Sequence, residues 1–395
     1  MHITRLLLWM LVWPFTVQAD WSQTLTEAQG QTVYFNAWGG SPAINAYIQN
    51  WADIAKSRHG IDVRHVKVND VGAVISAIET AKRAGGGADQ GSVDLMWING
   101  ENFARMKRAG LLSEPFVETL PNTAFVDLTD PSIAFDFSVP TDGLEAPWGR
   151  AQLVMMYDSD RIAEPPRSLD ALLAYAEAHP GRVTYPEPPN FHGTTFLKQV
   201  LLETTSHPQW LMEPYREERF DQATQGVWQF LDALHPVTWR QAQSFPDSAE
   251  DLMGLFADGL IDFALSFNPN DASRKIKSGE FAPTVRTYVH QSGTIGNTHF
   301  LAIPFNAQAS AGARVFINLL LSPEAQADKA NPEVWGDPTV LSMALLTQSD
   351  RQLFDALPIG AATLSAEALG RPLPEPHASW TEPLERAWKA RYFGQ

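Results

Sequence analysis

The sequence predicts an α/β protein built as two lobes. Signals for strands and helices alternate along the chain on both sides of about position 150, with no internal repeat or low-complexity segment between them. The chain has 395 residues, which is enough for two domains of ordinary size. Because 44% of the residues are hydrophobic and only 19% are charged, packed cores are expected and wholesale disorder is excluded.

Three strand–helix units are predicted in the first half. The apolar runs at 33–35, 61–68 and 93–98 are typical of buried strands. Ser41, followed by a proline, and Asp70 are suited to cap the helices that follow the first two strands, and a short third helix is expected at 102–109. This order favours a parallel sheet covered by helices.

The alternation returns in the second half. Helices are expected after Ser168, at 195–203, at 216–234, after the capping box that begins at Ser248, and at 309–321. Strands are expected at 151–157, 182–185, 261–267 and 298–303. Segments 140–148 and 293–297 are the candidate linkers.

Charge and cysteine content limit the possible partners and compartment. The chain has 29 Lys and Arg against 45 Asp and Glu, a formal net charge of -16, and no basic run, so a nucleic-acid partner is not expected. Residues 1–19 are typical of a secretory signal peptide, with Arg5 before an apolar run and cleavage expected after Ala19. Since the chain has no cysteine for a disulfide or a lipid anchor, we expect a protein exported to the periplasm.

Motifs for catalysis are absent from the sequence. It contains no His-Glu-x-x-His, P-loop, Gly-x-Ser-x-Gly or dinucleotide-binding glycine pattern, and the ten histidines lack metal-ligand spacing. We therefore predict no cofactor, no metal and no enzymatic activity.

Polar and aromatic residues gather where the predicted strands end, which is where open α/β sheets bind ligands. Glycine and serine at a helix start offer backbone N–H groups, tryptophan offers a face for a ring or a cation, and carboxylates such as Asp70 and Glu101 attract a cationic group. The candidate ligand-binding residues are Trp38, Gly39, Gly40, Ser41, Asp70, Trp97, Asn99, Glu101, Trp148, Asn190 and Asn268.

Several of these residues also have a plainer interpretation. Trp97 lies within a predicted strand and is more typical of a core residue, whereas Trp38 and Trp148 adjoin glycines in turns and are the stronger candidates. Asp70 fits a helix cap equally well, and Asn268 fits a turn before Pro269.

The order of several motifs resembles one known family. Residues 303–307 (Ile-Pro-Phe-Asn-Ala) and 316–326 (Phe-Ile-Asn-Leu-Leu-Leu-Ser-Pro-Glu-Ala-Gln) are its most specific match. Segments 34–40, 93–100, 110–112, 147–157 and 166–172 match in the same order, with Leu169 in place of the usual tryptophan. Over about residues 30–330 the chain resembles bacterial extracellular solute-binding proteins of ABC importers, in the branch that includes thiamine, polyamine and ferric-ion binders.

The resemblance implies a two-lobed periplasmic-binding-protein fold with a hinge and discontinuous lobes. One lobe would comprise 20–147 and 297–330, and the other 148–296 and 331–395. It also implies a monomer that binds a small molecule, cationic or ring-bearing like thiamine or a polyamine, and an ABC permease in the inner membrane as partner. Adjacent tyrosines, common in ferric-ion binders, are absent, which disfavours iron.

Two other functions remain open at this point. A periplasmic hydrolase or lyase acting on carbohydrate would need two carboxylates to converge, for example Glu101 and Asp271. An exported structural or chaperone-like protein would need no small ligand.

Overall fold

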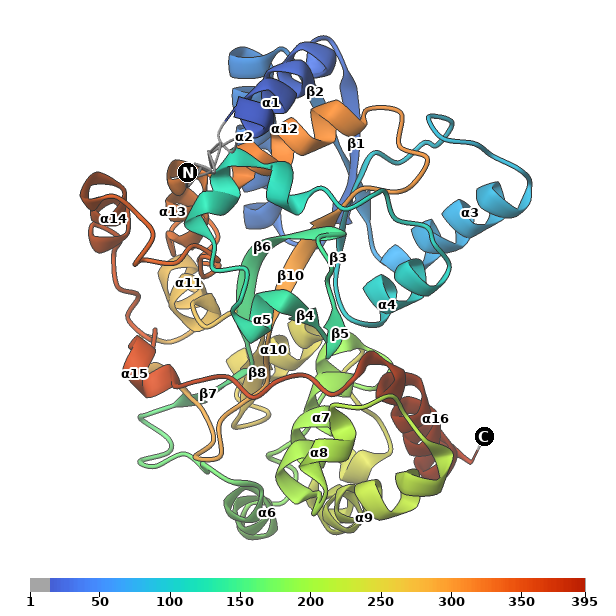
Figure 1. Ribbon diagram of the computed structural model, residues 1–395. Helices are drawn as coiled ribbons and strands as arrows, with labels where there is room; N and C mark the ends of the chain where they lie inside the picture. Colours follow the sequence, from blue (N-terminus) through green and yellow to red (C-terminus); the bar gives the residue numbers. More distant parts are fainter. Residues whose placement is uncertain (1–14, 395) are drawn as a thin grey trace, which may run out of the picture.

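The computed structural model describes residues 15–394 and shows two lobes, one above the other in Figure 1. β1 pairs in parallel with β2 and β3, whereas β10 runs antiparallel to β3 and β6. The five-stranded sheet of the first lobe has the order β2 (Asp62–Val68), β1 (Thr32–Trp38), β3 (Leu95–Ile98), β10 (Gly296–Ala302) and β6 (Glu145–Gln152).

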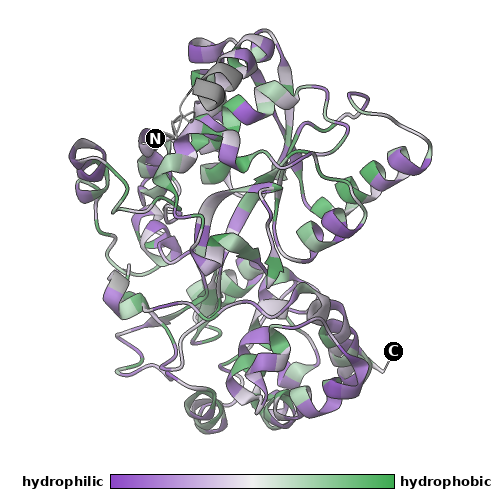
Figure 2. Cartoon of the chain, in the orientation of Figure 1, coloured by the Kyte–Doolittle hydropathy of each residue, from purple (hydrophilic) through white to green (hydrophobic). Residues whose placement is uncertain are grey.

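Helices α2 (Pro42–His59), α3 (Val71–Arg83) and α4 (Glu101–Arg108) follow the three parallel strands, which confirms the predicted order. The predicted caps are present: Ser41 Oγ accepts the N–H of Ile44 at 3.5 Å, and Asp70 accepts that of Gly72 at 2.8 Å. Figure 2 shows hydrophilic and hydrophobic residues alternating along α3, as expected for a helix with one buried face. Helices α1 (Phe15–Ala28), α12 (Ser310–Leu320) and α13 (Pro323–Ala330) complete this lobe.

The second lobe contains a small antiparallel sheet covered by helices. Its strands lie in the order β8 (Ala264–Ser266), β7 (Val154–Asp158) and β9 (Val285–Tyr288). Its helices are α6 (Leu169–Ala178), α7 (Phe191–Thr204), α8 (Pro208–Leu211), α9 (Glu217–Leu234), α10 (Ala249–Ala257), α11 (Asp271–Ser278) and α16 (Thr381–Phe393). Ser248 caps α10 as predicted, because its Oγ accepts the N–H of Asp251; the Asp251 carboxylate accepts from the same hydroxyl.

Short elements fill the connections. The hairpin of β4 (Phe135–Asp136) and β5 (Val139–Pro140) lies between the two lobes in Figure 1, next to α5 (Pro131–Ala134). The others are α14 (Gln348–Asp355), α15 (Ala366–Leu369) and the 3-10 helices Val117–Thr119, Pro121–Phe125, His235–Val237, Trp239–Ala242 and Ala378–Trp380.

Two strand predictions were wrong. Residues 182–185 form no strand, because the carbonyl of Val183 accepts from Trp239, that of Arg182 accepts from Asp262, and a proline follows at 186. The single strand expected at 151–157 is two strands, β6 and β7, which meet at Leu153 where the chain crosses between the lobes. Polypeptide also crosses at 293–297, one of the candidate linkers. The other candidate, 140–148, stays in the first lobe, where it leads from β5 into β6 and includes the first residues of β6.

Each lobe has its own hydrophobic core. The first surrounds Phe35, Trp148 and Phe316, and the second surrounds Tyr185 and Trp388. Trp335, Val340, Leu341 and Leu346 pack in the first core, although 331–395 was expected in the second lobe. We therefore propose that the first lobe extends to about residue 346.

The N-terminal signal region lies almost wholly outside the described residues. Helix α1 begins at Phe15 and continues through the expected cleavage point after Ala19. Among residues 15–394, no helix is long and apolar enough to span a membrane.

Candidate ligand-binding site

The carboxyl ends of β1, β2 and β3 meet at one edge of the first sheet because these strands are parallel. β10 leaves the second lobe at Gly296 and runs antiparallel to β3, with Phe300 opposite Ile98. The edge therefore faces the second lobe, and the loops that begin after Trp38, Val68 and Ile98 lie there.

The first loop contains Trp38, Gly39, Gly40 and Ser41. Trp38 is half-buried, and a Cβ added at Gly40 would overlap the indole, so the loop backbone itself covers part of one ring face. Gly39 accepts a hydrogen bond from the Asn45 side chain at 2.9 Å. These contacts hold the loop against the start of α2. Asp70, on the second loop, is exposed and caps α3, so its role toward a ligand stays a prediction.

Trp97 and Trp148 have environments opposite to those expected. Trp148 is 0% exposed and packs edge-on against Trp97 and Trp335, with ring centroids 5.1 Å apart in each pair. It sits at a bulge of β6 that directs the indole into the first core, so it has no free face for a guest. Trp97 is partly exposed at the end of β3 and is supported from behind by the other two rings. We therefore propose that Trp97, and not Trp148, contributes to the ligand-binding site.

The third loop is tied to the β4–β5 hairpin. Gly100 has a φ of 61° and donates its N–H to the buried carboxylate of Asp136 at 2.6 Å. A Cβ at Gly100 would lie 2.6 Å from the ring of Phe137, so only glycine fits. Asn99 stays partly exposed on this loop, and Glu101 is exposed at the start of α4.

The second lobe contributes the start of α7. Asn190 caps this helix by accepting the N–H of His192 at 3.0 Å. Phe191 is 38% exposed and packs edge-on against Phe267, with ring centroids 5.3 Å apart. Burial lowers the pKa of His192. Its neutral ring is therefore favoured at pH 7.

Asn268 of the second lobe forms a hydrogen bond to the main chain of Trp335, which packs in the first lobe. Its Nδ2 donates to the carbonyl of Trp335 at 3.2 Å, and its Oδ1 accepts the N–H of Asn270 at 2.9 Å. The second bond is the turn that its sequence position also predicted. Its side chain is thus engaged by protein groups, and its direct contact with a ligand stays a prediction.

Carboxylates gather where α4, the hairpin, α7 and the C-terminal segment meet. Burial raises the pKa of Glu375 and of Glu385, and burial together with neighbouring carboxylates raises the pKa of Asp136 well above its usual value. The negative charge of Glu101 contributes to raising the pKa of all three carboxyl groups. The positive charge of Lys198 lowers the pKa of the same three groups. Among the described residues at this meeting point, acidic groups therefore outnumber basic ones.

Contacts can be followed from one lobe to the other around this boundary. Trp97 packs on Trp335, whose carbonyl binds Asn268. On the other side Thr194 of α7 donates to Glu385 at 2.5 Å, and the charge of Glu101 raises the pKa of Glu385. Tryptophan, amide and carboxylate groups therefore lie along the boundary between the two lobes.

Sequence reasoning missed Asp136, Phe137, Lys198, Glu375 and Glu385. Lys198 did carry a signal, since it interrupts the apolar stretch of a predicted helix, where a charged residue requires a partner. Glu375 lies in a proline-rich segment without periodicity, so nothing local indicated its burial.

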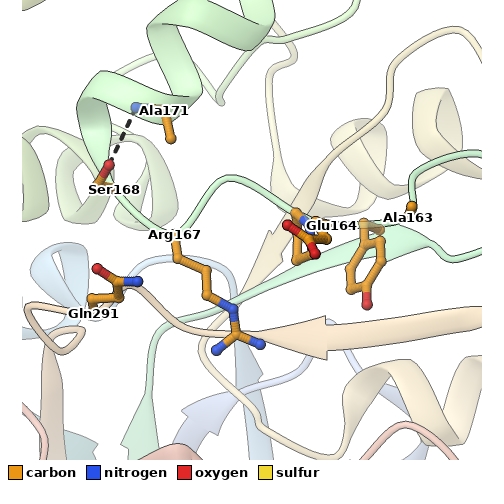
Figure 3. Close-up of a pocket in the computed structure, with 8 residues that line it drawn as sticks. Ala163, Glu164, Arg167, Ser168, Ala171 and Gln291 are labelled. Carbon is orange, nitrogen blue, oxygen red and sulfur yellow. Dashed lines mark hydrogen bonds between the residues drawn. The ribbon is translucent and has the colours of Figure 1, made fainter.

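A cavity of about 450 Å³ lies elsewhere, beside the start of α6 (Figure 3). Its lining includes Arg167, Glu164 and Gln291, all in the second lobe, and the cap bond from Ala171 to Ser168 forms one wall. It does not involve the loops of the first lobe.

The carboxylate named for the hydrolase alternative, Asp271, has partners within its own lobe. Within residues 15–394, no three His, Asp or Glu side chains are arranged so that they could hold a metal ion. Asp271, expected to pair with Glu101 in a hydrolase, is instead engaged by Arg274 and by Ser266 Oγ at 3.0 Å.

This two-lobed α/β architecture is that of substrate-binding proteins of ABC transporters. The spermidine/putrescine ABC transporter substrate-binding protein PotD from Streptococcus pneumoniae has a similar fold, with a TM-score of 0.61 and 14% identity over 92% of this chain and 99% of that one. A periplasmic thiamin binding protein matches with a TM-score of 0.58 and 16% identity over 91% of this chain and 95% of that one.

The chain belongs to the family described as bacterial extracellular solute-binding protein, whose sequence model matches residues 50–350. Protein YnjB from Escherichia coli (strain K12) is 43% identical over 378 residues, which are 95% of each chain. The predicted resemblance, including a narrower one to YnjB-type components, is thus confirmed. Such proteins bind small solutes for ABC importers and are not enzymes, which sets aside the hydrolase and the chaperone-like alternatives.

Proposed function

We propose that residues 1–19 direct export of this chain and are cleaved off after Ala19. The mature protein then remains in the periplasm as a monomer and delivers a small cationic solute to an inner-membrane ABC permease. The signal-like residues 1–19 and the lack of cysteine support this placement. The observation that carries the choice of a cation is the group of carboxylates at the lobe boundary, formed by Glu101, Asp136, Glu375 and Glu385.

Electrostatics and shape both favour such a guest. Carboxylates shielded from water attract a cation more strongly than exposed ones do, because the surrounding dielectric constant is lower. The partly exposed face of Trp97 adds a surface for a ring, an alkyl chain or a cation. We therefore place the guest between Trp97 and Glu101 of the first lobe and Phe191 and Glu385 of the second, and we infer that it is polyamine-like or thiamine-like.

A thermal-shift panel tests this function. Spermidine, putrescine and thiamine are compared with citrate, glucose and glutamate at equal ionic strength. A cation present at about 100 times its Kd should stabilise the protein by about 2.7 kcal/mol, which raises the Tm, while the neutral and anionic compounds leave it unchanged. A shift with anionic compounds alone would contradict the proposal.

Replacement of Trp97 by alanine should weaken binding of that cation without unfolding the protein. Loss of a stacking face costs about 1–3 kcal/mol in comparable sites, or roughly 5- to 150-fold in Kd. Isothermal titration calorimetry measures this change. Trp38→Ala is the matched variant. It should weaken binding less than Trp97→Ala does, because part of the Trp38 indole is already covered by Gly40. An unchanged Kd for Trp97→Ala would remove this ring from the site.

Cation affinity should fall as the pH is lowered. The pKa values of Glu375 and Glu385 are raised, so these groups take up protons above the ordinary carboxyl range of about pH 4–5 and lose the charge that attracts the guest. Asp136 acts in the same direction, because its pKa is also raised. Calorimetry between neutral and mildly acid pH should show proton release on binding. Glu385→Gln should flatten the pH profile, whereas replacing the exposed Glu382, whose charge is the smallest contribution to the raised pKa of Glu385, should change it less.

A further inference from the structure

We propose that Phe137, Glu375 and Asp136 form an ammonium-binding cage, that the chain's own Lys198 fills it, and that this internal ammonium clamps the two lobes together. The proposal goes beyond capture of a guest, because it concerns what holds the lobes when no guest is bound.

The geometry around Lys198 is that of a bound ammonium ion. Its side chain is 4% exposed, and its Nζ lies 3.3 Å from Glu375 Oε2 and 4.3 Å above the ring centroid of Phe137. A carboxylate at the side and an aromatic face below are the two elements with which proteins recognise alkylammonium groups. The charge of Lys198 also acts on Asp136, which is 1% exposed.

The buried carboxylates depend on this ammonium. Glu375 Oε2 and Asp136 Oδ1 are buried without a hydrogen-bond partner, and Lys198 is the cation beside the first of them. Their other oxygens are engaged, since Asn297 donates to Glu375 at 3.1 Å and Gly100 donates to Asp136. Removal of Lys198 therefore leaves Glu375 without its ammonium partner in a region shielded from water, which is destabilising.

The cage joins segments that are distant in sequence. Lys198 lies on α7 of the second lobe, whereas Asp136 and Phe137 lie on the hairpin next to Gly100 of the first. Glu375 lies on the C-terminal segment, where its carbonyl accepts from Ser138 at 3.1 Å. Separation of the hairpin from α7 would withdraw the ring of Phe137 from Lys198, so lobe movement is coupled to the cage.

Chemical rescue tests the cage. Lys198→Ala removes the atoms of one n-propylammonium ion and should lower the Tm. Added n-propylammonium should then raise the Tm saturably in this variant and not in the wild type, while 1-propanol, which has the same shape without the charge, should have no such effect. In Lys198→Ala/Glu375→Gln the rescue should disappear. A rescue equally strong with 1-propanol, or no rescue at all, would overturn the cage.

A second measurement covers the case in which Lys198→Ala does not fold. Lys198→Met keeps the volume and removes the charge. Spin labels at Asn50→Cys and Gln225→Cys, exposed positions on α2 and α9, report the distance between the lobes. We expect Lys198→Met to show a broader distance distribution than the wild type. An unchanged distribution would contradict the proposal that Lys198 holds the two lobes together. Neither experiment needs a guest, so this inference can fail while the proposed function stands.

Discussion

Replacement of Gly149 by alanine should lower the free energy of unfolding by about 3–5 kcal/mol. Gly149 lies on β6 opposite His299, and a Cβ there would overlap both His299 Nε2 and Asp337 Oδ2. Asp337 is buried and pairs with Lys329, which is 0% exposed, and with His299 at 3.1 Å. Because the methyl group would disturb the buried ion pair between Asp337 and Lys329, the cost exceeds that of ordinary overpacking.

Urea denaturation followed by circular dichroism measures this cost. Gly254→Ala is the matched control, because Gly254 is exposed inside α10 and a Cβ there meets nothing within 4 Å. That variant should gain up to about 1 kcal/mol from helix propensity. If Gly149→Ala proved as stable as the wild type, the close packing of β6 against Asp337 would be refuted.

Replacement of Trp148 by alanine should also destabilise the protein, by about 3–5 kcal/mol, because it removes the centre of the aromatic cluster in the first core. The ring is fully buried and contacts Phe35, Tyr47, Trp97 and Trp335, with centroids 5.1–6.3 Å apart. The same change at Trp97, which is partly exposed, should cost less stability and more affinity.

The two variants are compared by urea denaturation and by titration with the cation that binds most tightly. A Trp148→Ala protein that keeps wild-type stability and loses affinity would reverse the roles assigned to the two indoles. Wild-type affinity with reduced stability is the expected result.

Local signals predicted much of the fold because each rests on a nearby physical cause. Ser41, Asp70 and Ser248 cap helices where the sequence placed them, since side chain and N–H are only two or three residues apart. The alternation of strands and helices likewise predicted the parallel strands β1, β2 and β3. The motifs at 303–326 pointed correctly to the family.

The site was predicted less completely because its properties depend on distant partners. A tryptophan beside a glycine, such as Trp148 beside Gly149, is typical both of an exposed turn and of a buried strand bulge. The packing of Trp335 against Trp148 shows that the tryptophan is buried at a bulge. The burial of Glu375 depends on Lys198, 177 positions earlier by number, so no local pattern reveals it. The strand prediction for 182–185 was wrong for a similar reason, because the backbone N–H groups of Asp262 and Trp239, distant in sequence, donate to carbonyl groups of this segment.

The central claim is that a cationic guest binds between the two lobes, and a distance measurement across them tests it most directly. The chain has no cysteine, so Asn50→Cys and Gln225→Cys accept spin labels specifically. Whichever of spermidine, putrescine or thiamine gives the largest thermal shift is added to saturation. We predict a shorter and narrower distance distribution that requires Glu101 and Glu385. Saturation with an unchanged distribution would place the guest on one lobe and contradict the account.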